Sequence, residues 1–568
     1  MCFLLIGAES WAQCLSLPNT FTEQLNQADK IVEGRVVGQE SFLGPNGNVF
    51  TQNSLEVYRV FKGEAELTQS VVTEGGVFGD VMQLVTPSIQ LQIGDYGVLV
   101  LEADEQRNSL LMASNFISIN EANNAVSGSK NFSEREQLYK AIGRTTGSSQ
   151  MQLLRSPAVQ AASSKNAVEI GSVYPLEVTA GTKTLITISG QGFGQEQDGS
   201  CVAFHNADDG GQSFVGLNSG PHYVNWSDTE IQIYVPSATL YNSTVAGTGS
   251  IQVIKANGAI AESQEYLTVN YAKSEVIYAE NLNETMLVAK QYGGYEFTVN
   301  QNLLAFLGNS ELAAKCIEKW ACNTGANLRL GNAVTSVTEF GHDQINVLGL
   351  SNPGQLPTYL LGRTITTFSS CGTTNGLQWN LAEVDILLNA DIDWWISESQ
   401  PEGNTFDIET ALLHELGHAH LLQHNNDPNS PMYFELTTGT ARRDLHLQAD
   451  IEGGQFVATS SANADHTCSD EYHQPYDNSN CNLSVINGVG DEAIKTFSVY
   501  PNPFSDEILV SAEWLNEAEY SIFDATGRTV QSGSFGSSAI PTTKLSKGIY
   551  LLEVNTATEK FAQRIVKN

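Results

Sequence analysis

Four of the ten histidines in the chain fall within eleven residues, at positions 414, 418, 420 and 424. On a helix, residues four apart are only about 40° apart around the axis, so His414 and His418 project from the same face. Two imidazoles placed in this way can bind one Zn²⁺ at about 2.0–2.1 Å each. Glu415 follows the first histidine, where its carboxylate can reach a water on a metal rather than the metal itself. The H-E-x-x-H spacing therefore predicts metal-assisted hydrolysis.

A third histidine and a methionine make this pattern more specific, because two helical histidines also occur on solvated amphipathic helices. His424 stands ten residues after His414, and Met432 follows eight residues later, within Ser430-Pro-Met-Tyr433. For His424 to join the pair, the helix must end after His418 and the chain must turn back. Together these residues resemble the metzincin metalloproteases, and the spacing from His424 to Met432 is most similar to the matrixin branch.

The resemblance extends across residues 276–460. Matrixin-like catalytic domains have an early helix with a tryptophan, matched here by Trp320, then an edge strand and the zinc helix. The segment Phe406–Leu413 resembles the run into that helix, and Leu447–Gly454 resembles the closing helix. The resemblance implies an α+β zinc endopeptidase that acts on protein or peptide substrates. It implies these roles: zinc ligands His414, His418 and His424, general base Glu415, Met-turn residue Met432, and substrate-pocket residue Tyr433.

One position departs from the family pattern. The family has glycine seven residues after the first histidine, where this chain has Leu421. If that turn needs a positive φ, leucine is strained there by about 1–3 kcal/mol. Two rival ligands are weaker. His420 lies six residues along a helix from His414 and points away from it, as an exposed residue or a donor to a ligand, and Glu435 lacks a helical context.

Further sites are predicted with less specific signals. Near a predicted strand end, Asp385, Asp391 and Asp393 are candidate Ca²⁺ ligands, or simply an acidic edge. No cysteines form a C-x-x-C pair, so disulfides are expected in an exported protein rather than a thiolate metal site. Cys322 is expected to pair with Cys371 within the catalytic block, and Cys468 with Cys481 across a 12-residue loop. Cys201 and Cys316 have no partner that the sequence indicates.

The composition excludes several functions. The chain has 568 residues, with 28 Lys and Arg against 63 Asp and Glu, and a formal net charge of −35. A field of this sign repels a phosphate backbone, so nucleic acid is a poor partner. No apolar run reaches the length of about 18 residues that a membrane-spanning helix needs. Hydrophobic residues make up 41% of the chain, which is enough for several packed cores.

The N-terminal third is predicted to be β-rich. Residues 1–13 resemble the end of a secretory signal peptide. From 14 to 145, alternating runs such as Ile31–Val37, Leu55–Phe61 and Tyr96–Leu101 predict a small barrel or sandwich. This domain is a candidate prosegment, with Cys14 as a conceivable zinc blocker. Residues 146–167 are rich in Ser, Thr and Ala and are expected to form a linker.

Residues 168–271 are again β-rich and contain Gly190-Gln-Gly-Phe-Gly194. A phosphate-binding loop would open a helix, whereas polar and Gly-rich sequence follows here. The block instead resembles an immunoglobulin-like IPT/TIG module, with glycines in a strand-to-strand turn. A mixed α and β block, 276–460, and a polar linker, 461–494, complete this part. Helices are expected in the mixed block over Glu311–Trp320, Phe406–His424 and Arg442–Val457, and strands at Ile345–Leu348 and Val384–Leu388.

The last block, 495–568, contains Val499-Tyr-Pro-Asn-Pro-Phe504 and Lys547–Val554 before a basic end. These elements resemble the C-terminal sorting domain of the type IX secretion system of Bacteroidetes, a β-sandwich. The resemblance implies export across the outer membrane, with release or attachment at the cell surface, and the type IX machinery as a partner. Two functions follow from the whole sequence: a secreted zinc endopeptidase, or a surface-binding protein on an inactive metzincin scaffold.

Overall fold

The computed structural model forms two compact units, divided after Cys481. The segment 1–20, with the predicted signal peptide and Cys14, lies outside the described residues, and so does Cys468. The described residues are 21–86, 89, 91–104, 110–119, 126–127, 135–147, 150–154, 156, 168–195, 200–217, 220–237, 245–256, 259–278, 281–287, 293–373, 376–464, 473–477, 481, 498–500, 507–511, 518–524, 528–535, 539–555 and 560–567.

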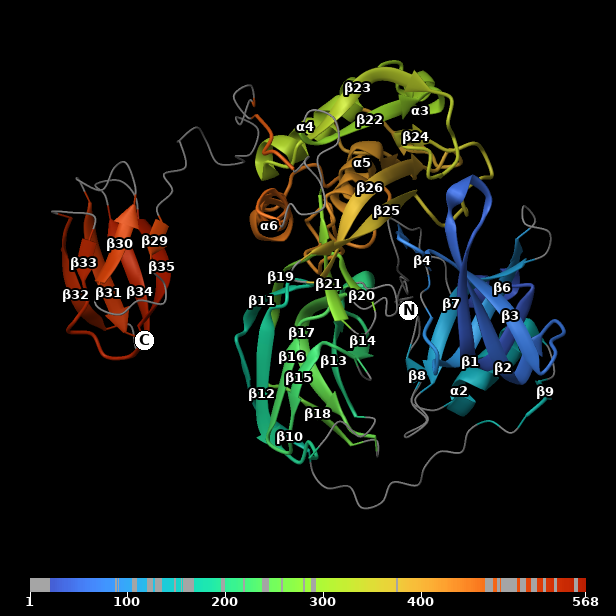
Figure 1. Ribbon diagram of the computed structural model, residues 1–568, viewed down its shortest axis with the longest axis horizontal. Coiled ribbons are helices and arrows are strands. Elements are labelled where there is room, and N and C mark those ends of the chain that lie inside the picture. Colours follow the sequence, from blue (N-terminus) through green and yellow to red (C-terminus); the bar gives the residue numbers. More distant parts are fainter. Residues whose placement is uncertain are drawn as a thin grey trace, which may run out of the picture. The chain divides into compact units, whose positions relative to one another are not determined.

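The first domain is a closed five-stranded barrel, in agreement with the predicted strands (Figure 1). Strand β1 pairs with both β2 and β6, which closes the ring in the order β1-β6-β7-β3-β2. Helices α1 (Phe21–Gln27) and α2 (Arg135–Thr146) pack on it, and β9 (Met151–Gln152), inside the predicted linker, pairs with β2. The barrel strands are β1 (Lys30–Leu43), β2 (Val49–Lys62), β3 (Thr68–Glu74), β6 (Tyr96–Asp104) and β7 (Leu110–Ile119), and β8 (Val126–Ser127) pairs with β7.

The second domain is an immunoglobulin-like sandwich. Its inward-facing apolar residues alternate along the strands and form one core. The glycine string begins in the last two residues of β12 and continues into the following turn, where Phe193 is buried while Gly192 and Gly194 adopt positive φ. One sheet contains β10 (Glu169–Tyr174), β12 (Leu185–Gln191), β16 (Glu230–Tyr234) and β15 (Tyr223–Trp226); the other contains β14 (Phe214–Leu217), β13 (Cys201–Asn206), β17 (Ala246–Ile254) and β18 (Ile260–Glu262); β11 (Glu177–Ala180) pairs with β19 (Thr268–Ala272).

The third region is built on a mixed sheet whose order is β23-β22-β24-β26-β25 (Figure 1). The first four strands are parallel to their neighbours, and β25 runs antiparallel to β26. Preceding it, β20 (Glu275–Tyr278) pairs with β21 (Asn281–Met286), which joins β26. The strands are β22 (Tyr295–Asn300), β23 (Leu328–Thr335), β24 (Asn346–Leu350), β25 (Gly362–Thr373) and β26 (Gly376–Leu388).

A hairpin from the barrel extends this sheet. Strands β4 (Gly76–Phe78) and β5 (Val81–Thr86) leave the barrel between β3 and β6, and β5 pairs antiparallel with the outer edge of β25. The side chain of Gln83 joins the two domains, because its Oε1 accepts from Val49 N and its Nε2 donates to Thr367 Oγ1 at 2.9 Å. This pairing between domains had no counterpart in the sequence analysis.

The predicted helices form, with shifted ends. The helix expected at Glu311–Trp320 runs to Thr324 as α4, and the one expected over Phe406–His424 is α5 (Ile408–Ala419), preceded by the short strands β27 (Trp394–Trp395) and β28 (Phe406–Asp407). The third begins later than predicted, with a π-helical turn at Leu447–Ile451 and then α6 (Glu452–Ala462). Helix α3 (Gln301–Leu307) follows β22 directly, capped by Asn300.

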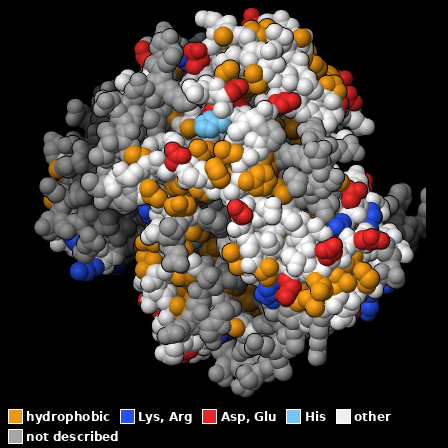
Figure 2. Space-filling model, turned by 45° about the vertical axis from the view of Figure 1, so that its right-hand side comes forward, with side chains coloured by type: hydrophobic (Ala, Val, Ile, Leu, Met, Phe, Trp, Pro, Cys, Tyr) orange, Lys and Arg blue, Asp and Glu red, His pale blue; other side chains and the backbone are white. Residues whose placement is uncertain are grey.

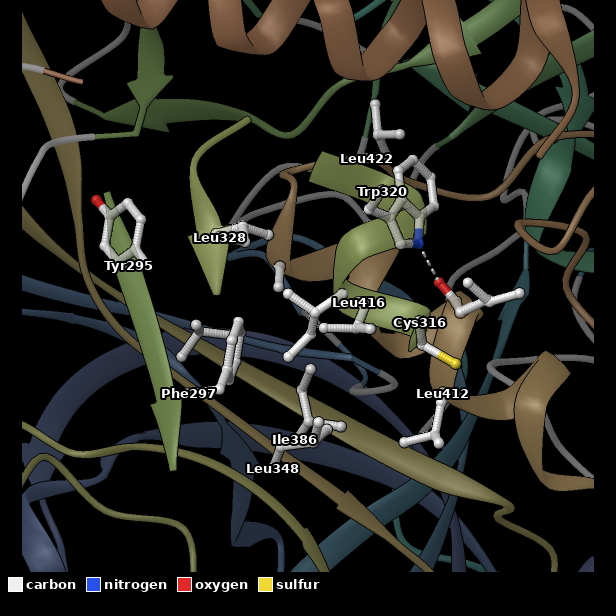
Figure 3. Packing of buried hydrophobic residues seen from close by; sticks show 14 of the residues in the cluster. Tyr295, Phe297, Cys316, Trp320, Leu328, Leu348, Ile386, Leu412, Leu416 and Leu422 are labelled. Atoms are coloured by element: carbon white, nitrogen blue, oxygen red, sulfur yellow. Dashed lines mark hydrogen bonds between the residues drawn. The ribbon is translucent and has the colours of Figure 1, made fainter. Parts of the chain in front are cut away.

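One apolar core lies between this sheet and helices α4 and α5 (Figure 3). Trp320 on α4 is fully buried, and its indole Nε1 donates to Leu413 O on α5 at 2.9 Å. Phe297, Leu348 and Ile386 come to the same core from three neighbouring strands, as Figure 3 shows. The sheet and α4 thereby fix the position of α5.

The disulfide predictions are corrected by the structure. Cys322, at the end of α4, is bonded to Cys481 and not to Cys371, so the predicted Cys468–Cys481 pair is wrong as well. Cys371 is also disulfide-bonded, while Cys201 and Cys316 are buried free thiols. The segment expected to be a linker is tied to the mixed domain before this bond, because Gln474 N donates to Gly293 O at 2.9 Å. Sequence proximity favoured the short loop, but the fold brings distant cysteines together.

The second unit is a β-sandwich of its own, as predicted for the last block. Its core includes Ile508, Ile522, Leu552 and Ile565. One sheet has β29 (Ser498–Tyr500), β30 (Glu507–Ser511) and β33 (Ala539–Pro541); the other has β32 (Thr529–Ser534), β31 (Glu519–Asp524), β34 (Gly548–Asn555) and β35 (Lys560–Lys567).

Acidic side chains lie on the surface, as the excess of Asp and Glu in the sequence predicts (Figure 2). On the face drawn in Figure 2, acidic side chains are scattered among polar and hydrophobic ones. Within the described part of the chain, no helix is both long enough and apolar enough to span a bilayer.

The core makes a first prediction. Phe297→Ala should lower the free energy of unfolding of the mixed domain by about 3–5 kcal/mol, because it removes a fully buried ring. Urea unfolding followed by tryptophan fluorescence measures this, since Trp320 and Trp379 lie in the same core. The matched control is Phe306→Ala on α3, whose side chain is 41% exposed and should matter by less than about 0.5 kcal/mol. Equal effects of the two changes would contradict the assignment of this core.

Candidate metal centre

Helix α5 carries two of the three candidate ligands, His414 and His418, and is buried on every side. Asp407 caps its start, where its carboxylate accepts from Thr410 N at 2.9 Å and from the guanidinium of Arg443. All twelve residues of the helix are buried. A helix with no solvated face belongs in a domain interior, so its histidines and glutamate face protein rather than bulk water.

The three predicted ligands meet at one point. His414, His418 and His424 each offer a ring nitrogen, and these atoms all lie within 4.8 Å of one another. The Nε2 atoms of His414 and His418 are 3.1 Å apart. Tetrahedral zinc with nitrogen ligands at 2.0–2.1 Å would space them by about 3.3 Å, so the measured pair is close to that geometry. Among the described residues, no other group of His, Cys, Asp or Glu meets in this way.

The other ring nitrogens fix the orientation of each imidazole. His414 Nδ1 donates to Pro431 O at 2.7 Å, and His418 Nδ1 donates to Leu422 O at 2.9 Å. His424 Nδ1 contacts Asp208 Oδ1 at 2.7 Å. Because the Nδ1 protons are committed outward, neutral rings turn Nε2 lone pairs toward the shared point. Two lone pairs at that distance repel each other, and a cation between them removes the repulsion.

The protonation states agree with this donor set. Burial lowers the pKa of His414 well below its usual value, and burial lowers that of His418 to about 3. Neutral imidazole is the form that binds metal. His424 Nε2 is buried and has no hydrogen-bond partner in the part of the chain that the structure describes. A set of three imidazole nitrogens fits zinc, and three protein ligands are typical of its catalytic type of site.

Glu415 lies beside these ligands and against β25. Its Oε2 accepts from Thr364 Oγ1 at 2.5 Å, while Oε1 is buried without a partner among the described residues. Burial raises the pKa of Glu415 to about 8, and a divalent cation nearby would favour the ionised form. A Cβ at Gly362 would come within 2.7 Å of Oε1, so the absence of a side chain there leaves space beside the carboxylate.

The turn after the helix adopts the strained conformation that the sequence analysis anticipated. Leu421 has a φ of +61°, where glycine would be unstrained. Its side chain is fully buried in the main core, and its carbonyl accepts from Ser274 N at 2.8 Å. Gln423 N donates to Ala272 O at 2.9 Å. Core burial and the chain at 272–274 therefore hold a turn that brings His424 back to the helix.

Met432 packs against α5 at Gly417. A Cβ at Gly417 would sit 2.1 Å from Met432 Sδ, so a larger residue there would have to displace the methionine. Met432 N donates to Ser430 Oγ at 2.9 Å, and this hydroxyl donates to Asp450 Oδ1 at 2.6 Å. Asp450 lies in the π-helical turn before α6. The closing helix thus supports the loop under the candidate ligands.

The remaining predicted residues have clear places. Tyr433 is half-buried, with the Arg442 guanidinium over its ring at 5.4 Å. His420 is fully buried, contrary to its expected exposure, and stacks on Trp320 at 4.6 Å, away from the three ligands. Glu435 is not part of the ligand group.

The three aspartates proposed for calcium do not come together as a ligand group. Asp385 is buried and accepts from Gly341 N and Val347 N, both at 3.0 Å. Asp391 accepts from Gly354 N at 2.6 Å. The carboxylates of Asp385 and Asp391 hold local backbone, and calcium binding stays a prediction.

Two residues of the site were missed by the sequence analysis. Thr364 lies in an alternating strand and carries no signal apart from its type. Asp208 lies 216 residues before His424 in a different domain, in the short 3₁₀ turn Ala207–Asp209. No spacing rule connects residues so far apart, so only the fold could place them.

Two family models match parts of this chain. The model of the IPT/TIG domain matches residues 169–269, and that of the secretion system C-terminal sorting domain matches residues 498–568. The chain is a type IX export substrate. It is therefore secreted or held at the cell surface, and the export machinery is its partner. Neither match covers residues 414–432, and no curated protein sequence matches the chain.

Similarity to solved structures is slight. Dimeric latent PorU from Porphyromonas gingivalis has 9% identity and a TM-score of 0.14, covering 83% of this chain and 42% of that one. PorZ, a type-IX secretion component of Porphyromonas gingivalis, has 9% identity and a TM-score of 0.12, with coverages of 94% and 75%. Sidekick-1 immunoglobulin domains 1–5 have 9% identity and a TM-score of 0.11, with coverages of 86% and 95%. Scores this low do not bear on the fold. The chain spans less than half the length of PorU.

The strained turn makes a second prediction. Leu421→Gly should lower the melting temperature, because the burial it loses, about 2–5 kcal/mol, exceeds the strain it removes, about 1–2 kcal/mol. Leu421→Ala loses similar burial and keeps the strain, so it should melt at a lower temperature still. Thermal unfolding of the metal-free chain gives the order. A glycine variant more stable than the wild type would show that strain, not core burial, dominates this turn.

Proposed function

We propose that this protein is a secreted zinc-dependent endopeptidase. The observation that carries the proposal is the convergence of three buried imidazole nitrogens. Glu415, which follows the first of these histidines on α5, has a buried Oε1 with no hydrogen-bond partner among the described residues. Such a donor set with an adjacent acid is the arrangement for metal-assisted hydrolysis. The exported state of the chain suits an enzyme that meets protein substrates outside the cell.

The surrounding architecture supports a metzincin-like catalytic domain. Within this region, the parallel strands are followed by the antiparallel strand β25. Thr364 on β25 donates a hydrogen bond to Glu415. The tryptophan-bearing helix packed on α5, the turn to His424 and the methionine against α5 support this part of the proposal. These features favour this fold for residues 276–460.

The residues divide the work of peptide hydrolysis. When bound, zinc would supply a Lewis acid that polarises the scissile carbonyl and activates water for attack. Glu415 takes a proton from that water on its carboxylate and returns it to the leaving amine. Thr364 holds one oxygen of Glu415, and the other oxygen, which has no partner in the described part of the chain, is the one proposed to carry the proton. Burial keeps His414 and His418 neutral, and the carbonyls that accept from their Nδ1 atoms orient the two rings.

The general base makes a third prediction. Glu415→Ala should abolish cleavage of casein while zinc remains bound, because Glu415 holds no metal but moves the proton. Activity is measured with and without a chelator, and zinc content is measured on the same samples. Retained cleavage by Glu415→Ala would contradict the role of Glu415. If fully processed, zinc-loaded wild type, freed of the barrel domain, cleaves nothing, the alternative of an inactive surface-binding protein would take the place of the enzyme.

The barrel is proposed to act as a prosegment through its hairpin. An extended peptide can bind an enzyme by pairing with an exposed strand edge, and β25 is the strand next to the catalytic glutamate. That edge is taken by β5, with Thr86 paired to Thr364, the residue that bonds Glu415. A protein substrate needing the same edge must displace β5, so the intact chain is held latent.

Latency by β5 makes a fourth prediction. Gln83→Ala should raise kcat/KM on a short peptide about tenfold, because it removes buried hydrogen bonds worth about 1–3 kcal/mol that fasten β5. The matched control is Gln39→Ala, whose amide bonds only Asn53 Oδ1 and Leu91 O within the barrel. An unchanged or lower kcat/KM for Gln83→Ala would show that β5 is a fixed part of the catalytic domain and does not hold the enzyme latent.

A further inference from the structure

The third histidine differs from the other two in the group that orients it. His414 and His418 donate to backbone carbonyls of Pro431 and Leu422, which lie in the same segment of the chain. His424 instead contacts the carboxylate of Asp208 at 2.7 Å, and Asp208 belongs to the immunoglobulin-like domain. Both side chains are buried, with exposed fractions of 4% for His424 and 10% for Asp208.

Asp208 is held in place by its own domain. It lies in the 3₁₀ turn Ala207–Asp209, which Asn206 caps by accepting from Asp208 N at 3.0 Å. Gly210 follows with a φ of +68° and closes the turn. The carboxylate of the neighbouring Asp209 is bonded within its own loop instead, where it accepts from Gln212 N at 2.8 Å and from Ser213. Of these two adjacent carboxylates, Asp208 alone contacts the third ligand.

The surrounding contact between the two domains is close. A Cβ at Gly210 would lie 2.6 Å from both Phe434 Cε1 and Tyr433 Oη. A Cβ at Gly247, on β17, would lie 2.0 Å from Asn426 Oδ1. Glycines at these positions let the loops of the sandwich approach the segment around His424. Residues 272–274 also form backbone hydrogen bonds with Leu421 and Gln423, just before His424.

We propose that Asp208 is a positioning residue of the metal centre, which makes the IPT/TIG domain a structural part of the zinc site. This inference rests on the metal centre of the proposed function. The carboxylate holds the proton of His424 on Nδ1 and keeps Nε2, which is buried without a described partner, available for metal. A carboxylate also raises the donor strength of the ring more than a carbonyl does. The mixed domain alone would carry a loosely held third ligand.

The test is the zinc affinity of the metal-stripped full chain, measured by competition with a chromogenic chelator. Asp208→Asn should weaken zinc binding about tenfold and Asp208→Ala up to about 100-fold, as for other partners of metal-bound histidines. Asp209→Asn, which removes the same charge one residue away, should match the wild type. Co²⁺ absorption of the loaded proteins gives a second readout, and its ligand-field bands should shift for Asp208→Asn and not for Asp209→Asn.

Each outcome decides the inference. Asp208→Ala binding zinc as tightly as the wild type would overturn it, and so would equal losses in the Asp208 and Asp209 variants. If Asp208→Ala does not fold, the near-isosteric Asp208→Asn carries the test. A wild type that binds no zinc would overturn both this inference and the metal centre. Zinc binding that is weakened by Asp208→Asn, in a protein that cleaves nothing, would support this inference and remove only the endopeptidase.

Discussion

The metal centre depends on which ring nitrogen of His414 and of His418 carries the proton. The Nδ1 atoms of His414 and His418 give their protons to the carbonyls of Pro431 and Leu422, so the Nε2 lone pairs of these rings face each other at 3.1 Å. In a dry interior this arrangement is unfavourable by itself, because like partial charges are not screened. A cation at that point turns the repulsion into attraction. The surrounding helices and loops hold these two imidazole rings in this orientation.

Several remote elements take part in that support. Trp320 on α4 fixes the backbone of α5 through Leu413. Asp450, before α6, holds Ser430 and thereby the loop that carries Pro431 and Met432. The chain leaving the immunoglobulin-like domain bonds the turn at Leu421. A site assembled from parts so far apart in sequence is rigid only when all of them fold, and this dependence is the usual cost of a preorganised metal centre.

The sequence was sufficient to predict the histidines that the fold brings together and the presence of the IPT/TIG and sorting domains. Helical periodicity predicts that His414 and His418 share a face, with Glu415 next to them. The spacing of His424 and Met432 predicts that both lie near that helix, and the structure brings them there. The IPT/TIG and sorting domains were predicted near the bounds of the matching families. These features depend on local pattern, which a single sequence records.

What could not be predicted depends on contacts between distant segments. The bond from Asp208 to His424 and the pairing of β5 with β25 join separate domains. The Cys322–Cys481 disulfide spans 159 residues, and the sequence favoured the nearer cysteines. His420 was expected to be an exposed residue or a donor to a ligand, but it is buried at the end of α5, where its Nδ1 donates to Leu416 O.

The central claim is that one zinc ion binds at these three histidines, and X-ray absorption at the zinc edge of the purified full chain tests it most directly. The account predicts one zinc per chain with three imidazole nitrogens and one oxygen at about 2.0–2.1 Å. That signal should be lost when His414 and His418 are both replaced by alanine. A spectrum with sulfur ligands, a six-oxygen shell, or a signal that survives the double replacement would contradict the account.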